Sequence, residues 1–205
     1  MRACEKLPGV IFVMIGPGGA GKNAIMKAVI AEFSNVRQLA TATTRQMRSD
    51  EAQGREHLFL SQAEFARMIE CGDLLEYQEV TPGKFYGIPR QSIADALASG
   101  AVRIADIDVL GAKVLAQAFK DNVIQLYITV PGVEMAEQLE VLRQRMRARA
   151  DQFTDIEERL ERAKTLELPY KDECDYVVVN DDLAQAVSRT RAIVKRELKA
   201  RGLQS

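Results

Sequence analysis

The sequence has few of the residues that build metal centres and disulfide frameworks. Its 205 residues include no tryptophan, one histidine and three cysteines, Cys4, Cys71 and Cys174, which form no CxxC pair. An odd number of widely spaced cysteines and a single histidine argue against a zinc site or a disulfide framework. Free thiols are typical of a reducing compartment, so we expect a cytoplasmic protein.

Long apolar runs and a large net charge are also missing. The longest early apolar run, Val10–Ile15, is much shorter than the roughly 20 residues that cross a bilayer. No signal-peptide cleavage pattern follows it. The formal net charge is −1 at pH 7, so the chain has no overall basic field for nucleic acid. We therefore expect neither a membrane nor a nucleic acid as partner, and any anion site must be built locally.

Segments with strand and helix patterns alternate along the chain. Val10–Ile15 is a continuous β-prone run, as in a strand that is buried on both faces. A glycine-rich turn and a helix over 22–33 follow it. The later patterns predict strands over 36–40, 102–108, 123–130 and 176–179, helices over 109–120, 131–150 and 155–167, and a last helix that Asp181 caps and that ends near Lys199. Strands that alternate with helices predict an α/β fold with a parallel sheet.

Residues 41–90 interrupt this alternation with a more polar texture. Turn residues recur there at Gly54, Gly72, Pro82, Gly83 and Gly87. A helix over 62–70 is predicted to begin at Ser61, because Glu64 three residues later completes a capping box. We expect this segment to be a small insertion into the core.

The turn after the first strand has the GxxxxGK pattern of a phosphate-binding loop. Glycines let backbone N–H groups converge on phosphate oxygens, and the N-terminus of the following helix adds a favourable dipole. Because a strand precedes the pattern and a helix follows it, we expect a nucleoside triphosphate to bind here. The residues predicted to bind it are Gly16, Pro17, Gly18, Gly19, Ala20, Gly21, Lys22 and Asn23.

The last of these residues departs from the usual pattern. Asn23 stands where such loops have a serine or threonine that binds Mg²⁺. An amide oxygen can still ligate Mg²⁺ or hold one of its waters. We therefore expect metal binding that is weaker or differently arranged.

The insertion carries polar residues that suit a phosphate monoester and a purine base. Arg45 and Arg48 lie three residues apart beside hydroxyl residues, which suits them to clamp a phosphate. A solvated charge pair is the alternative for these two arginines. Glu76 can accept two hydrogen bonds from a guanine edge, from its N1–H and its amino group.

With these motifs the sequence resembles guanylate kinase along nearly its whole length. The resemblance rests on the phosphate loop, the TTRxxR segment at 43–48, Leu75-Glu76, Tyr86-Gly87, Asp106-Ile107-Asp108 and the segment 176–183. It implies an ATP-dependent nucleoside monophosphate kinase that transfers the γ-phosphoryl group of ATP to GMP with Mg²⁺. It also implies three parts. These are a core of residues 1–40, 91–140 and 163–205, a GMP-binding insertion of residues 41–90, and an arginine-rich lid of residues 141–162.

By position, the resemblance implies which residues bind GMP and the metal. The GMP-binding residues are Thr41, Arg45, Arg48, His57, Glu76, Tyr86 and Asp106. Asp106 would also organise the metal waters, so Asn23 and Asp106 are the predicted metal residues. Two residues apart after an apolar strand, Asp106 and Asp108 are expected to share one face, which suits indirect Mg²⁺ coordination. For Asp108 a cap on the following helix is the alternative.

Arginines alternate at positions 143, 145, 147 and 149 along the predicted helix over 131–150. Residues four apart share a helical face, so Arg145 and Arg149 are expected to point together. By resemblance, Arg145, Arg149 and Arg159 match lid arginines that close over ATP and stabilise charge on the transferring group. With Lys22 and Arg48 they are the predicted catalytic residues. The chain before Arg145 is longer than is usual in the family, and Ala150 stands where the lid has a glycine.

Three substitutions lie inside the expected site. Besides Asn23, His57 stands where the family has a tyrosine that binds the GMP phosphate. Ile88 stands where it has a serine or threonine that hydrogen-bonds guanine. A buried guanine acceptor left unpaired costs on the order of 1–3 kcal/mol, so we expect weaker GMP binding rather than none. His57 can still donate to a phosphate, or it is a strand histidine without a role.

The same substitutions leave two alternatives to a guanylate kinase. Ribose 1,5-bisphosphate phosphokinases are similar to the family and carry an acidic, a histidine and an apolar residue at these three places. Against them, Glu76 is retained, and a sugar phosphate does not need it. A guanylate-kinase-like binding module without catalysis is the second alternative, although Lys22, Arg45 and Arg48 are all present. The oligomeric state stays open between a monomer and a homodimer.

Overall fold

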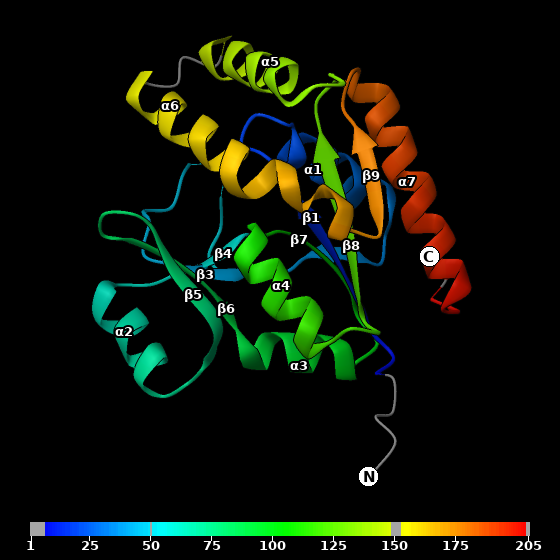
Figure 1. Cartoon of the computed structure of the whole chain (residues 1–205). Coiled ribbons are helices and arrows are strands. Elements are labelled where there is room, and N and C mark those ends of the chain that lie inside the picture. The colour runs from blue at the N-terminus through cyan, green and yellow to red at the C-terminus, as the bar shows by residue number, and fades with distance from the viewer. Residues whose placement is uncertain (1–6, 50, 149–152, 204–205) are drawn as a thin grey trace.

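A central sheet of five parallel strands forms the core of the structure, a computed structural model that describes residues 7–49, 51–148 and 153–203 (Figure 1). The strand order is β2-β7-β1-β8-β9. The bounds are β1 Val10–Ile15, β2 Val36–Gln38, β7 Val102–Asp106, β8 Val123–Thr129 and β9 Tyr176–Val179. The predicted α/β fold with a parallel core is thus confirmed.

Helices cover both faces of this sheet (Figure 1). On one face α1 (Lys22–Glu32) and α7 (Leu183–Ala200) pack around Phe12 and Leu126. On the other face α3 (Arg90–Ala98) and α4 (Val109–Ala118) pack around Ile11 and Tyr127. All six residues of β1 are buried, because alternate side chains enter the two cores.

Two further helices lie near the arrowhead ends of β8 and β9 in Figure 1. These are α5 (Met135–Ala148) and α6 (Phe153–Arg162), and Leu142 and Leu160 join them to the core on the side of α1. A π-helical segment, Ala163–Glu167, and a 3₁₀ segment, Leu168–Glu173, lead back to β9. This end of the sheet is where parallel α/β folds bind their ligands.

A second, smaller sheet is built entirely from residues 41–90. Its order is β4-β3-β6-β5, with bounds β3 Thr41–Thr43, β4 His57–Phe59, β5 Leu74–Thr81 and β6 Lys84–Pro89. Helix α2 (Gln62–Glu70) packs on it through Phe65. The predicted capping box is confirmed, because Ser61 Oγ accepts from Glu64 N at 3.2 Å and Glu64 Oε2 accepts from Ser61 N at 2.7 Å.

Two predictions about aspartates are wrong. Strand β7 ends at Asp106, so Asp108 does not share a strand face with it. Asp108 instead caps α4, and its Oδ1 accepts from the backbone N of Leu110 at 2.8 Å and of Gly111 at 3.1 Å. The N-terminus of α7 is capped by Asp182, whose Oδ1 accepts from Gln185 N at 2.9 Å. Asp181 accepts from Asp182 N instead.

Two helix ends also differ from the sequence prediction. The helix expected over 131–150 begins at Met135, since Gly132 has a φ of 136° and cannot continue it. The helix expected over 155–167 changes to π-helical geometry at Ala163. π-helical turns inside α-helices are frequent at functional sites.

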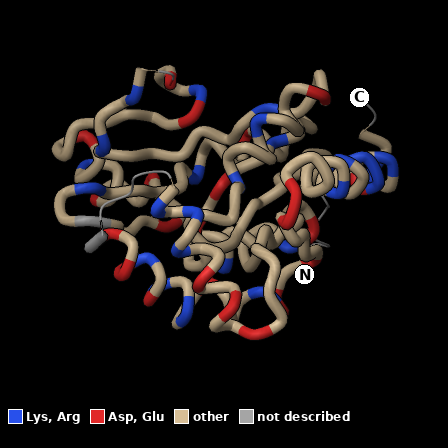
Figure 2. The backbone as a smooth tube through the Cα atoms, turned by 90° about the horizontal axis from the view of Figure 1, so that it is seen from above, with Lys and Arg blue, Asp and Glu red and all other residues tan. Residues whose placement is uncertain are grey.

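Charge is spread over the molecule. Figure 2 shows lysine and arginine interspersed with aspartate and glutamate along the chain. Within the described ranges, no helix combines the length and the apolar composition that crossing a membrane requires.

Candidate active site

The phosphate loop connects β1 to α1 and depends on glycine. Gly16 and Gly21 have φ angles of 138° and 94°, which residues with a side chain rarely adopt. A Cβ on Gly16 would lie 2.0 Å from the carbonyl oxygen of Ile128, and one on Gly21 would lie 2.3 Å from Asn180 Nδ2. Glycine is therefore required at both positions of the GxxxxGK pattern for steric as well as conformational reasons.

Lys22 lies folded over this loop. Its Nζ donates to the carbonyl oxygens of Gly16 at 2.6 Å and Pro17 at 3.3 Å, and it lies 3.7 Å from Asp106 Oδ1. Burial raises the pKa of Asp106, while the Lys22 charge opposes that shift. The ammonium thus joins the loop to the end of β7.

Asn23 and Asp106 offer the oxygen donors that a hard cation prefers. Mg²⁺ is bound through one or two carboxylates and substrate phosphates, and it keeps several waters. An amide, a carboxylate and a phosphate loop at one edge of a pocket fit such a partial ligand set. The described residues contain no cluster of three or more histidine, cysteine, aspartate or glutamate side chains, so they provide no full protein cage.

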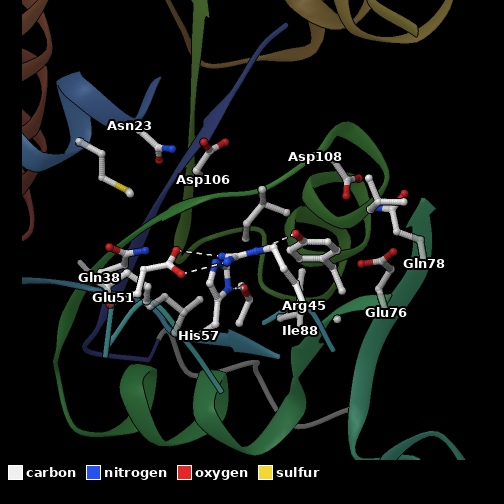
Figure 3. Close-up of a pocket in the computed structure, with 18 of the residues that line it drawn as sticks. Asn23, Gln38, Arg45, Glu51, His57, Glu76, Gln78, Ile88, Asp106 and Asp108 are labelled. Carbon is white, nitrogen blue, oxygen red and sulfur yellow. Dashed lines mark hydrogen bonds and ion pairs between the residues drawn. The ribbon is translucent and has the colours of Figure 1, made fainter. Parts of the chain in front are cut away.

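A pocket of about 360 Å³ lies beside the loop, between the core and the smaller sheet (Figure 3). We call it the acceptor pocket. All seven predicted GMP-binding residues line it, together with Asn23. They come from separate parts of the chain, namely Thr41 of β3, Arg45 and Arg48 of the following loop, His57 of β4, Glu76 of β5, Tyr86 of β6 and Asp106 of β7.

One end of the acceptor pocket is dominated by Arg45, which lies against Glu51 in Figure 3. Its Nη1 and Nη2 donate to the two Glu51 carboxylate oxygens at 2.9 and 2.8 Å. Its Nε donates to Tyr86 Oη at 3.2 Å, and Nη1 also donates to Gln46 O at 2.6 Å. Four of the five guanidinium N–H groups are thus engaged with Glu51, Tyr86 and Gln46.

Glu51 is a site residue that sequence reasoning missed. Besides Arg45 it binds Arg48, whose backbone N donates to Glu51 Oε2 at 2.8 Å. The hydrogen bonds from Arg45 lower the pKa of Glu51 to about 2. Its position three residues after Arg48 was the available signal. Within the described residues the Arg48 side chain is exposed, and only its main chain is held.

His57 contacts the same end through Thr41. The Thr41 hydroxyl and His57 Nδ1 are 2.7 Å apart. Burial, and then the nearby Arg45 charge, lower the pKa of His57. The neutral form of His57 is thus favoured in the free protein, and in that form it can offer a phosphate one N–H.

The other end of the acceptor pocket holds the carboxylates of Glu76 and Asp108 beside the apolar side chain of Ile88. Burial, and then the charge of Asp108, raise the pKa of Glu76 to about 7. Gln78, on the same face of β5 and also in the lining, hydrogen-bonds Glu76 and was missed from the sequence. Ile88 is 2 % exposed and belongs to the core as well as the lining.

Gly111 of α4 keeps space open at this end. A Cβ there would lie 3.0 Å from Glu76 Oε2 and 3.2 Å from Ile88 Cδ1. No sequence pattern marked this glycine, because the contact joins residues that are distant in the chain. A side chain at position 111 would therefore crowd both Glu76 and Ile88 at this end of the pocket.

Two of the predicted lid arginines lie near the phosphate loop. Arg145 Nη2 donates to Asn180 O at 2.7 Å, and Asn180 Nδ2 donates to the loop residue Ala20 at 2.7 Å. The Cδ of Arg159 lies 3.9 Å from the position of a Cβ on Gly18. Arg149 lies outside the described residues.

Glu167 is a further residue that the sequence did not single out. It lies in the π-helical segment, accepts a hydrogen bond from the Gly18 backbone and lies 3.5 Å from Arg162. Burial raises its pKa, and the charge of Lys22 opposes the shift. The carboxylate of Glu167 thus contacts the loop at which phosphates are expected.

Comparison with known proteins places these features in one family. Residues 9–197 match the family model described as guanylate kinase. The guanylate kinase of Salinibacter ruber is 37 % identical over 191 residues, which are 93 % of this chain and 97 % of that protein. That of Symbiobacterium thermophilum is 38 % identical over 201 residues, 96 % of this chain and 89 % of that protein. The crystal structure of guanylate kinase from Anaplasma phagocytophilum superposes with a TM-score of 0.69 at 29 % identity, covering 94 % of this chain and 87 % of that one.

Proposed function

This chain belongs to the guanylate kinase family, and we propose that the acceptor pocket is its GMP site and the phosphate loop its ATP site. The protein is a guanylate kinase, an ATP-dependent phosphotransferase that acts on a nucleoside monophosphate. The curated relatives do not favour the two alternatives, a ribose bisphosphate kinase and a binding module without catalysis.

The observation that carries the assignment of the pocket is the separation of its two ends. Arginines and hydroxyl groups gather at one end, and Glu76 stands against an apolar wall at the other. A nucleoside monophosphate has the same division, with a charged phosphate and a flat base. Glu76 then accepts hydrogen bonds from guanine N1–H and N2–H, and Gln78 supplies a neighbouring amide.

The reaction requires positioning and charge neutralisation more than proton transfer. A phosphate monoester has its second pKa near 6, so its oxygens are already anionic at neutral pH and need no general base. One such oxygen attacks the γ-phosphorus of ATP in line. Lys22, Arg48 and the lid arginines Arg145, Arg149 and Arg159 neutralise the charge that spreads over the transferring group.

Asn23 and Asp106 would hold Mg²⁺, directly or through waters. When bound, the ion neutralises charge on the β- and γ-phosphates of ATP. Lys22 bridges the loop and Asp106, so it keeps that carboxylate at the loop. The division into a core, a GMP-binding insertion of residues 41–90 and a lid of residues 141–162 belongs to the same proposal, as does a cytoplasmic location.

A panel of acceptors tests this function. ADP release from ATP and Mg²⁺ is measured with GMP, dGMP, AMP and ribose 1,5-bisphosphate. GMP and dGMP are expected to give a higher kcat/KM than AMP and ribose 1,5-bisphosphate, because only guanine offers two donors to Glu76. Turnover with ribose bisphosphate but not with GMP would identify the sugar-phosphate kinase, and ATP binding without any turnover would identify the non-catalytic module.

A further inference from the structure

A second cavity, of about 660 Å³, lies behind the acceptor pocket. Gln38 and Leu39 line both cavities, so the two lie back to back across the connection from β2 to β3. The floor of the second cavity comes from β2 and β7 and one wall from α3. Residues 53–55 form the opposite wall. The cavity thus lies at the joint between the core and the smaller sheet.

Two arginines stand side by side on its floor. Arg37 of β2 is in register with Arg103 of the parallel strand β7, so both side chains leave the same face of the sheet. Each donates to the carbonyl oxygen of the residue before it, at 3.0 Å for Arg37 and 3.2 Å for Arg103. Within the described residues neither has a carboxylate within ion-pair distance. Burial, and then the Arg37 charge, lower the pKa of Arg103.

Like charges directly opposite each other on neighbouring strands are destabilising. The other groups of the cavity do not remove this repulsion. Asp95 is its only acidic lining residue within the described part of the chain, and Asp95 Oδ1 accepts from Gln91 at 2.7 Å. Arg55 adds a third guanidinium on the opposite wall, where it pairs with Glu56. Because Arg55 is paired with Glu56, the excess positive charge of the described lining comes from Arg37 and Arg103, against the single carboxylate of Asp95.

Local rules of stability are broken in native proteins mainly at functional sites. Paired guanidinium groups present parallel N–H donors that match a phosphate better than any neutral ligand. Ser92 of α3 and Ser99, which caps the C-terminus of that helix, line the same cavity, and the Ser99 hydroxyl donates to Ala96 O at 3.1 Å. Its volume lies in the range of small-molecule sites, which leaves room for more than a bare ion.

We propose that this cavity is a second ligand site, in which Arg37 and Arg103 bind a phosphate-class oxyanion, either inorganic phosphate or the phosphate of a small monoester. The site is distinct from the acceptor pocket and does not depend on the function proposed above. It also lies against the segment that presents His57, since Gly54 N donates to His57 O at 2.8 Å.

Thermal unfolding of wild type, Arg37→Gln and Arg103→Gln tests the proposal. The matched control is Arg67→Gln, which removes an arginine of α2 that lines neither cavity. The unfolding temperature is measured in sodium phosphate and in sodium chloride of equal ionic strength. Phosphate is also expected to bind at the phosphate loop, but that contribution is common to all four proteins.

In chloride, Arg37→Gln and Arg103→Gln are expected to unfold about 2 °C higher than wild type, because the repulsion is gone. In phosphate, wild type and Arg67→Gln are expected to gain several degrees more than the two cavity variants. Equal phosphate-dependent gains in all four proteins would overturn the proposal. A repeat with glycerol 3-phosphate distinguishes the sources, since a larger gain than with inorganic phosphate identifies a monoester ligand.

Discussion

The phosphate loop and the acceptor pocket adjoin each other but are built in opposite ways. The loop is one contiguous segment, residues 16–23, and its shape is fixed by the backbone contacts of Gly16 and Gly21. The pocket is assembled from side chains of six separate strands, of helix α1 and of the loops between them. A short pattern therefore identifies the loop, whereas the pocket can exchange individual residues, as at His57 and Ile88, and keep its division into two ends.

The largest expected effect on turnover comes from a substitution in the phosphate loop. Replacing Lys22 with alanine (Lys22→Ala) removes the cation that the loop holds at Gly16 O and Asp106. Loss of one preorganised charge in a site of this kind lowers kcat by roughly 100- to 1000-fold. ADP release under saturating ATP and GMP measures it, and Lys84→Ala, an exposed lysine of β6, is the matched control. Near-normal turnover of Lys22→Ala would contradict the assigned role of the loop.

The next effect lies at the phosphate end of the pocket. Glu51→Gln weakens both hydrogen bonds that Arg45 donates to Glu51. Bonds between charged groups contribute about 1.5–3 kcal/mol, so the KM for GMP should rise about tenfold to a hundredfold while kcat changes less. The control is Glu70→Gln at the exposed end of α2. A lower kcat with an unchanged KM for GMP would show that Glu51 does not position Arg45 for the acceptor.

Glu51 also makes the stability of the folded protein depend on pH. Its pKa is about 2 in the folded protein against 4.5 without these bonds, so its ionised form is bound more favourably in the folded state. This stabilisation is complete above pH 4.5 and is lost as the pH falls from 4.5 towards 2. Acid unfolding of Glu51→Gln is therefore expected to be less steep in that window than that of wild type.

At the other end of the pocket, where the guanine base is expected, GMP binding should depend on pH near neutrality. With a pKa of about 7, Glu76 is mostly protonated at pH 6 and mostly ionised at pH 8. Only the ionised carboxylate accepts both guanine donors, so GMP affinity should rise about tenfold over this interval. In the free protein the same shift has the opposite sign, and the stability contributed by Glu76 declines as the pH rises from 4.5 through 7.

Glu76→Gln separates this effect from the titration of the GMP phosphate, which also falls near pH 6. In this variant the pH dependence that comes from the GMP phosphate remains, whereas the part that comes from the Glu76 carboxylate is lost. Its GMP affinity should therefore be lower at pH 8 and should change less between pH 6 and 8 than that of wild type. Identical pH profiles would mean that Glu76 is not at the base.

The same contrast explains how far the sequence could predict this molecule. The loop, the parallel core and the capping box of α2 follow from local patterns, and all three agree with the structure. The smaller sheet was expected only as an insertion, because its strands are short or half-exposed and lack a clear alternation. Helix α3 was not predicted either.

Within the site, the missed residues are those whose role depends on contacts across the fold. Gly111 matters because α4 brings it against Glu76, and Glu167 matters because a π-helical turn brings it to Gly18. Asp108 was misassigned for the opposite reason. A strand face and a helix cap are both local patterns, and β7 ends two residues earlier than the sequence suggested.

The smallest expected effect returns to the loop and its one unusual side chain. Asn23→Ser restores the hydroxyl that such loops use for Mg²⁺, and it leaves the backbone contacts of Gly16 and Gly21 unchanged. A hydroxyl and an amide oxygen are both neutral ligands, so the Mg²⁺ concentration for half-maximal rate should fall only about threefold. The rate is measured against Mg²⁺ at fixed ATP and GMP, with KM for GMP as the internal control. A large drop in KM for GMP would mean that Asn23, which lines the acceptor pocket, acts on the acceptor and not on the metal. Asn23 would then belong to the acceptor pocket by function, and the division between the phosphate loop and the pocket would not hold at this residue.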